Sequence, residues 1–108
     1  MNKYLVILLT VIFYLQCTNS PNDSSLTIYT HRHYDVDKEI FANFEKEMGI
    51  KINVVNASAD ELIQRIESEG DQTPADLLIT VDAGRLVRAK EKNLFQSFNS
   101  SMIDSTIP

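Results

Sequence analysis

The chain has 108 residues, with ten Lys or Arg and fifteen Asp or Glu, so its formal net charge at pH 7 is −5. This length permits one domain at most. The positive residues are interleaved with carboxylates and form no basic run, which argues against the phosphate-neutralising surface expected of a nucleic-acid-binding protein.

Residues 1–16 predict an export signal. Lys3 supplies a positive charge, and residues 4–15 form an apolar run that only Thr10 interrupts. A charged start followed by a short apolar region is typical of a signal peptide. A transmembrane helix is the weaker interpretation, because it needs about 20 apolar residues and this run is shorter.

Cys17, the only cysteine, follows the apolar run directly, where a bacterial lipoprotein signal places the thiol that receives lipid. A lone cysteine in an exported protein has no intrachain disulfide partner, and lipidation would explain it. Gln16 and Tyr14 depart from the residues that such signals prefer, so an incidental cysteine is the alternative. Residues 17–25 are rich in Ser and Asn and predict a flexible linker.

From residue 26 to residue 108 the sequence repeats one pattern three times, an apolar strand followed by an amphipathic helix. This alternation predicts an α/β fold in which flanking helices cover a parallel sheet. The strands are expected at residues 26–29, 50–56 and 75–80. The third is an almost continuous apolar run, which is typical of a strand covered on both faces.

The first helix is expected from Asp35 to Met48. Asp35 or Asp37 can cap its start, and Gly49 can end it in the left-handed conformation. One face is predicted to be apolar and carries Ile40, Phe41, Phe44 and Met48.

The second helix begins with a capping box formed by Ser58 and Glu61, and Gly70 ends it. Asp82 is expected to cap the third helix. The residues expected to face inward are Leu62, Ile63 and Ile66 in the second helix and Ala83, Leu86, Val87 and Ala89 in the third. After Asn93 the apolar residues no longer follow a regular helix or strand spacing.

A three-stranded parallel sheet of this size has a marginal core, since a small domain buries only about 60% of its unfolded surface. Open parallel sheets rarely stop at three strands, and both edges of this one would be unprotected. We therefore expect the chain either to pair with a partner or to be part of a longer one.

The turn after the first strand holds the densest group of chemically active side chains: His31, Arg32, His33 and Tyr34. In open α/β sheets, ligands bind outside the carboxyl ends of the strands, so a site is expected at this place. The alternative is a polar surface turn, with solvated histidines and the Tyr34 ring packed on the helix.

Four parts of the chain resemble a known family: residues 28–35, residues 44–54, residues 59–63 together with 68–70, and residues 74–86. Together they are similar to the periplasmic ferric-iron-binding proteins of ABC uptake systems, in the tyrosine-rich branch of the type II periplasmic binding protein fold. The resemblance runs from about residue 26 to 108. It implies that the chain is an N-terminal fragment, the first part of lobe 1.

In that family two α/β lobes close on Fe³⁺, which tyrosine phenolates hold, often with a histidine from the first strand-to-helix turn. The resemblance implies that Tyr34 is a metal ligand and that His33 is a second candidate. Some members use a carboxylate after the third strand, where this chain has Val81. Asp82, the next residue, is more simply a helix cap.

Weaker pocket candidates are Arg32, Asp82 and Arg85. The arginines can balance phenolate charge or hold a companion anion, and the region from Asp82 to Arg85 lies at a helix N-terminus, which favours anions. The remaining tyrosine ligands of the family would follow residue 108, so the expected iron binding by this chain alone is weak.

The predicted function is therefore that of the substrate-binding component of a ferric iron uptake system. Its cargo would be Fe³⁺, its partner an ABC permease in the inner membrane, and its location the periplasm or cell envelope through a lipid anchor, as a monomer when full length. The alternatives are a protein of the same fold for an oxyanion or small organic anion, and a non-binding truncated remnant. No nucleophile, base and orienting group can be assembled, so an enzyme is not expected, and neither is a catalytic cofactor.

Overall fold

The computed structural model describes residues 24–107. The predicted signal peptide, Cys17 and the first residues of the linker lie outside this range. Within it, no helix is long and apolar enough to cross a membrane. The elements in chain order are β1 (Ser25–Thr30), α2 (Asp35–Met48), β2 (Lys51–Asn56), α3 (Ala59–Glu69), the 3₁₀ turn η1 (Gly70–Gln72), β3 (Leu77–Ile79), α4 (Ala83–Glu91) and α5 (Ser101–Thr106).

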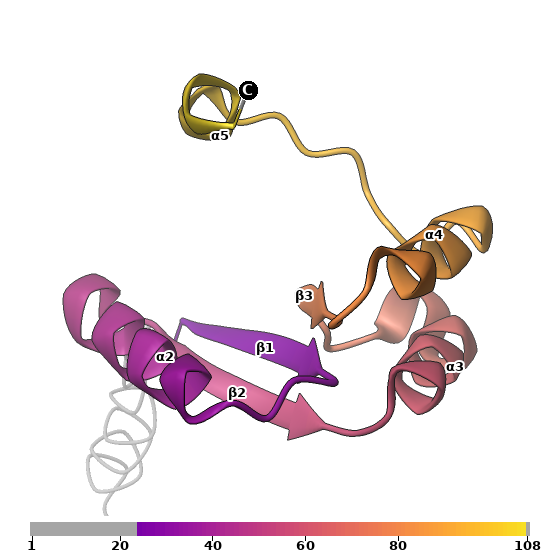
Figure 1. Ribbon diagram of the computed structural model, residues 1–108, viewed down its shortest axis with the longest axis horizontal. Helices are drawn as coiled ribbons and strands as arrows, with labels where there is room; N and C mark the ends of the chain where they lie inside the picture. The colour runs from indigo at the N-terminus through magenta and orange to yellow at the C-terminus, as the bar shows by residue number, and fades with distance from the viewer. Residues whose placement is uncertain (1–23, 108) are drawn as a thin grey trace, which may run out of the picture.

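The three strands form one parallel sheet in the order β2-β1-β3, as the sequence predicts (Figure 1). Thr30 at the end of β1 pairs in register with Asn56 at the end of β2 and with Ile79 at the end of β3. All three carboxyl ends therefore meet at one edge of the sheet. The chain passes from β1 to β2 on one side of β1 and then crosses to β3 on the other side of β1. The central strand β1 therefore lies at the switch point of the topology, where ligands bind in such sheets.

The core lies between α3 and one face of the sheet. Tyr29 is fully buried there against Leu62 and Ile66 of α3, and its strand neighbours Val55 and Leu78 pack on the same cluster. Side chains alternate along a strand, so these three neighbouring strand residues share a face. Burial of these large side chains in one cluster is the main hydrophobic stabilisation of the described fold.

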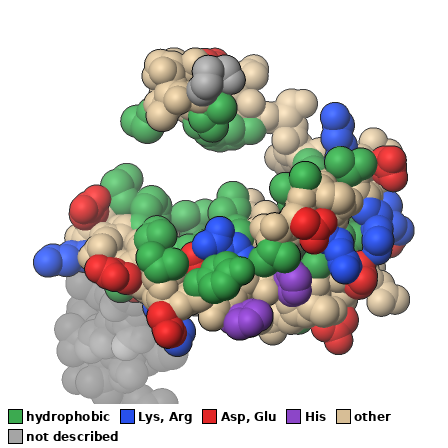
Figure 2. Space-filling model, in the orientation of Figure 1, with side chains coloured by type: hydrophobic (Ala, Val, Ile, Leu, Met, Phe, Trp, Pro, Cys, Tyr) green, Lys and Arg blue, Asp and Glu red, His purple; other side chains and the backbone are tan. Residues whose placement is uncertain are grey.

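The opposite face of the sheet is only partly covered. Val54 and Leu77 are 48% and 51% exposed. The expectation that the third strand is covered on both faces is therefore wrong for the described residues. The helix on that side, α2, contacts β2 and no other strand of the described sheet, so it leaves β3 uncovered. Figure 2 shows hydrophobic side chains gathered along this side of the molecule.

The start of α2 differs from the prediction. Its N-cap is Tyr34, and neither Asp35 nor Asp37 caps it, since both already lie in the first turn. Their carboxylates bind Lys38 and Arg32 instead. Acidic residues in a first turn still interact favourably with the helix dipole. The end of the helix is as predicted.

Gly49 ends α2 with φ of +66° and donates its backbone N–H to the carbonyl of Glu45. A left-handed residue in this position suits glycine. The predicted apolar face of α2 exists but is not buried, because Ile40 and Met48 are 55% and 59% exposed.

The cap predictions for the next two helices are confirmed. Ser58 and Glu61 form the capping box of α3, and Asp82 accepts a hydrogen bond from the backbone N–H of Arg85 at 3.0 Å. The predicted inner face of α3 is buried. In α4 only Ala89 is buried, and Leu86 and Val87 are exposed. The prediction for that face is therefore confirmed for Ala89 and wrong for Ala83, Leu86 and Val87, because α4 packs on α3 alone among the described elements.

The C-terminal part holds a helix that the sequence pattern did not predict. Residues 94–100 form no regular element and lead to α5, where Ser100 caps the first turn through a hydrogen bond from the N–H of Ile103. Figure 1 shows α5 well apart from the sheet and from α4. The exposed apolar residues of this part include Phe98 and Met102, at 76% and 75%.

Candidate functional site

The turn from His31 to Tyr34 leaves β1 at the edge where all three strands end. The backbone N–H of His31 donates to the carbonyl of Ile79 at 3.0 Å, and the Asn56 side-chain amide donates to the carbonyl of Arg32 at 2.6 Å. These bonds fasten the turn to both neighbouring strands. The turn is therefore a fixed part of the sheet edge.

Tyr34 and His33 project from this turn into solvent. Tyr34 is 53% exposed, and its ring stacks on that of His33 with centroids 6.1 Å apart and planes inclined by 24°. No residue from 24 to 107 forms a hydrogen bond with the Tyr34 hydroxyl. Both candidate ligands are thus exposed side by side, and the phenol oxygen has no hydrogen-bond partner in the described part of the chain.

Arg32 lies between Tyr34 and the start of α2. Its Nε and Nη2 donate to the two carboxylate oxygens of Asp37 at 3.1 and 2.8 Å. Its guanidinium carbon lies 5.1 Å from the centroid of the Tyr34 ring, a cation–π contact. The structure therefore joins three charged or aromatic side chains in one row, from Asp37 through Arg32 to Tyr34.

The other two weaker candidates lie in the turn after β3 and in α4. Asp82 caps α4, and the Arg85 guanidinium binds the carboxylate of Asp60 in α3, with a longer contact of 3.7 Å to Asp82. The hydrogen bond from Arg85, with smaller contributions from Arg88, lowers the pKa of Asp60. In this structure Arg85 is thus engaged by carboxylates, and an anion would have to compete with them.

Sequence reasoning missed two residues that shape the turn, Asp37 and Asn56. The sequence predicts Asp37 as a possible helix cap, which the structure contradicts, and Asn56 as the last residue of a strand, which the structure confirms. A usable signal for Asn56 is its type, since it is a polar residue at the carboxyl end of a strand beside the expected site. Asp37 carries no comparable signal, because its role depends on how Arg32 turns.

His31 differs from His33 and Tyr34 because part of its side chain is buried. Its Nδ1 atom is buried and has no hydrogen-bond partner among the described residues. Its backbone joins the turn to β3, so its place in the chain is structural. The Tyr34–His33 pair remains the exposed part of the cluster.

The donor set suits a hard cation but does not complete a site. Ferric iron prefers anionic oxygen, which a tyrosine phenolate supplies, and imidazole also binds iron. Residues 24–107 contain no group of three or more His, Cys, Asp or Glu that could hold a metal ion. Tyr34 and His33 therefore fit as two ligands of a larger sphere.

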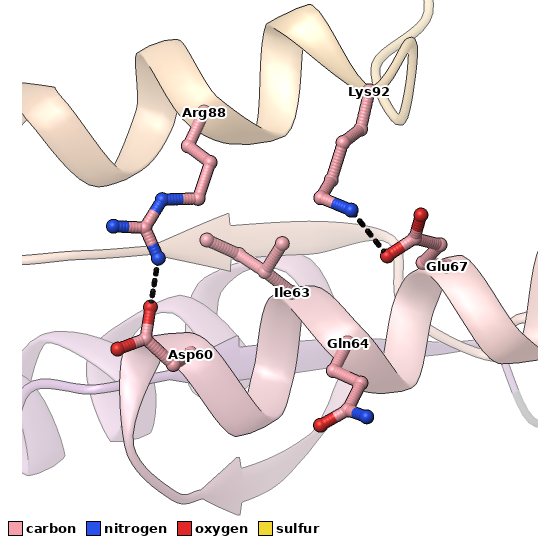
Figure 3. Close-up of a pocket in the computed structure, with 6 residues that line it drawn as sticks. All are labelled: Asp60, Ile63, Gln64, Glu67, Arg88 and Lys92. Carbon is pink, nitrogen blue, oxygen red and sulfur yellow. Dashed lines mark hydrogen bonds and ion pairs between the residues drawn. The ribbon is translucent and has the colours of Figure 1, made fainter.

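A shallow groove of about 260 Å³ lies elsewhere, between α3 and α4 (Figure 3). Ion pairs bridge it at both ends, from Arg88 to Asp60 and from Lys92 to Glu67, and Ile63 lies between them. The charged side chains that line it are thus paired with each other across the two helices. The groove is a seam that joins α3 to α4, away from the turn at His33.

Comparison with known proteins gives a consistent set of likenesses. Residues 26–107 match the sequence profile of a family described as bacterial extracellular solute-binding protein. "Iron uptake protein A1" of Synechocystis sp. is 46% identical over 83 residues, which are 77% of this chain and 23% of the relative.

Two solved structures of iron-binding proteins are also similar to this chain in three dimensions. A Trichodesmium protein in complex with iron and citrate ligands has a TM-score of 0.74 and 44% identity, covering 79% of this chain and 27% of that one. The ferric binding protein from Campylobacter jejuni has a TM-score of 0.75 and 43% identity, covering 77% and 26%. These likenesses confirm the predicted α/β fold. The chain spans about a quarter of the length of each of these proteins.

Proposed function

Because this chain belongs to the family of bacterial extracellular solute-binding proteins, we propose that it supplies the first-lobe part of a ferric-iron site in an ABC-type iron uptake system. The observation that carries the proposal is the adjacent pair of His33 and Tyr34. Both side chains are exposed at the shared carboxyl edge of the three strands, and the Tyr34 hydroxyl is unbonded within residues 24–107. The iron-related relatives support the choice of metal.

Tyr34 is the main ligand in this proposal. A phenol with an ordinary pKa of about 10 must lose its proton to bind Fe³⁺, and the metal drives that ionisation. Binding therefore releases a proton and weakens in acid. His33 is the second ligand, through a neutral ring nitrogen. The other ligands are supplied by water or by residues outside this chain.

Arg32, Asp82 and Arg85 form the weaker part of the proposed pocket. A companion anion such as citrate would be attracted to the arginines and to the N-terminus of α4. It would displace Asp37 from Arg32 or Asp60 from Arg85, since each guanidinium is now paired with a carboxylate. An anion contact at this place is consequently secondary to the phenolate.

The remaining parts of the proposal concern the whole protein. Residues 1–16 direct export, Cys17 carries the lipid, residues 17–25 form the tether, and the lobe begins at residue 26. The protein then works at the outer face of the inner membrane and delivers iron to a permease, as a monomer. Two or more acyl chains would make the attachment effectively permanent. Labelling with a radioactive fatty acid, with Cys17→Ser as the control, tests this part.

Ferric citrate titration tests the site itself. The protein that carries this chain, expressed with any residues that follow Pro108 in its gene, is expected to develop a phenolate-to-iron charge-transfer band. Tyr34→Phe removes the phenol oxygen and should weaken the band and the binding. His31→Gln, a change in the same turn, should leave both unaltered. Equal iron binding by wild type and Tyr34→Phe would refute the assignment, and binding of an oxyanion without iron would favour the alternative function.

A further inference from the structure

Arg32 is the best anchored residue of the site turn. Its side chain binds both oxygens of Asp37, and the side chains in this pair are only 34% and 16% exposed. Its backbone N–H donates to the hydroxyl of Thr30 at 3.0 Å, and its carbonyl accepts from Asn56. Three elements, β1, β2 and α2, thus hold one residue. A bidentate pair of this kind fixes the plane of the guanidinium as well as its position.

The Tyr34 ring lies against that guanidinium. The ring contacts the Arg32 guanidinium at 5.1 Å and the His33 ring at 6.1 Å, and its hydroxyl has no partner within residues 24–107. A half-exposed tyrosine without a hydrogen bond to its hydroxyl would otherwise sample several rotamers. The contacts of the ring with Arg32, which Asp37 holds, and with His33 are therefore the ones among the described residues that can restrict the direction of the phenol oxygen.

We propose that Arg32 and Asp37 are positioning residues for the metal ligand: Asp37 orients Arg32, and Arg32 holds the Tyr34 ring in the direction from which its oxygen binds the metal. This inference rests on the proposed ferric site. A ligand that is already oriented loses less side-chain freedom when the metal binds. The positive guanidinium beside the ring also offsets the negative charge of the bound phenolate.

Asp37→Asn is the main test, and Asp35→Asn is its matched control. Both changes remove one negative charge from the first turn of α2, but within residues 24–107 Asp35 pairs with the exposed Lys38 and forms no ion pair with Arg32. In the protein that carries this chain, Asp37→Asn should weaken ferric binding from citrate by about threefold to tenfold. Asp35→Asn should leave it unchanged.

A measurement without iron separates positioning from metal chemistry. NMR relaxation of the Tyr34 ring in the iron-free protein should show a lower order parameter in Asp37→Asn than in wild type or Asp35→Asn. Arg32→Lys provides a second variant if Asp37→Asn folds poorly. It keeps the charge and a single ion pair but loses the planar contact, so ferric binding should fall by a smaller factor.

A charge-swapped variant separates positioning from simple stabilisation of the fold. Arg32→Asp combined with Asp37→Arg restores an ion pair between the two positions but removes the cation from the ring of Tyr34. Its thermal midpoint should recover toward that of wild type, whereas ferric binding should stay weak.

The outcomes distinguish the inference from the proposed function. If Tyr34→Phe binds iron as wild type does, the ferric site itself is refuted. If Tyr34→Phe loses iron while Asp37→Asn and Asp35→Asn bind it equally, the positioning role is refuted and the site stands. Full recovery of ferric binding in the swapped variant also overturns the positioning role, because the ion pair alone would then suffice.

Discussion

The hydroxyl of Tyr29 lies 3.1 Å from each carboxylate oxygen of Glu69, forty residues further along the chain. This contact joins the central strand β1 to the last residue of α3. Arg65 completes the arrangement, because it pairs with Glu69 at 2.7 Å and its guanidinium lies 4.9 Å from the centroid of the Tyr29 ring. Four predictions concern this cluster, a helix cap and the seam between α3 and α4.

Tyr29→Phe should destabilise the fold by about 1.5–3 kcal/mol, the usual contribution of a hydrogen bond to a charged partner. The ring and its packing remain, so the loss is confined to the hydroxyl. Urea denaturation followed by circular dichroism measures it. Tyr34→Phe serves as the control, since that hydroxyl has no partner within residues 24–107, and an equal loss in both variants would contradict the prediction.

Glu69→Gln should reduce stability at neutral pH and make it less dependent on pH in acid. The hydrogen bond from Arg65, followed by those from Thr73 and Tyr29, holds the pKa of Glu69 below its ordinary value of 4.5. A carboxylate whose pKa is lower in the folded state stabilises the fold above the unfolded pKa, and this contribution is lost as the pH falls through the folded value.

The measurement for Glu69 is the urea midpoint of wild type and Glu69→Gln at several pH values. The difference between them should be largest near neutral pH and should narrow as the pH falls below 4.5. A difference in urea midpoint that stays constant through this pH range would show that the charge of Glu69 is not what stabilises the fold. Thr73→Val, which removes one of the smaller contributions, should give the same pattern more weakly.

Ser58→Ala should cost about 1 kcal/mol, because it removes the oxygen that accepts from the backbone N–H of Glu61 at the start of α3. Thermal unfolding measures the loss. Ser68→Ala in the same helix is the control, since Ser68 only bonds back to the carbonyl of Arg65. If the two variants unfold at the same temperature, the capping box contributes nothing measurable.

Asp60→Asn should loosen the seam between α3 and α4, because Asp60 pairs with both Arg85 and Arg88. The loss should be clear at low ionic strength and shrink in about 1 M salt, where exposed charges are screened. Asp71→Asn, which removes a charge from the exposed turn η1, is the comparison. A salt-independent difference between these two variants would argue against an electrostatic seam.

Most of the fold could be predicted from the sequence because its signals are local. The capping box at Ser58, the left-handed Gly49 and the alternation of strands and helices each depend on a few neighbouring residues. The burial of the apolar faces of α2 and α4 could not be predicted in the same way. Leu86 and Ile40 follow an amphipathic pattern, but whether they are covered depends on which elements pack against them.

The site shows the same division. Residue types at the end of a strand drew attention to the turn, and the family resemblance singled out His33 and Tyr34 as candidates within it, whereas the role of Asp37 could not be predicted. Sequence spacing makes Asp37 a helix cap as readily as a partner of Arg32, and only the path of the turn decides between them. The unpredicted α5 is a further case, since its six residues carry little periodicity of their own.

The bonds that tie the site turn to its neighbours also bear on the order of folding. Asn56 is 24 residues from Arg32, and Ile79 is 48 residues from His31 (79 minus 31), so neither contact forms until a whole crossover is in place. Contacts of such sequence separation form late, because the loop they close must first lose its entropy. The neighbouring strand pairs, Thr30 with Asn56 and Thr30 with Ile79, span similar separations, so the turn that presents Tyr34 is expected to become ordered together with this edge of the sheet.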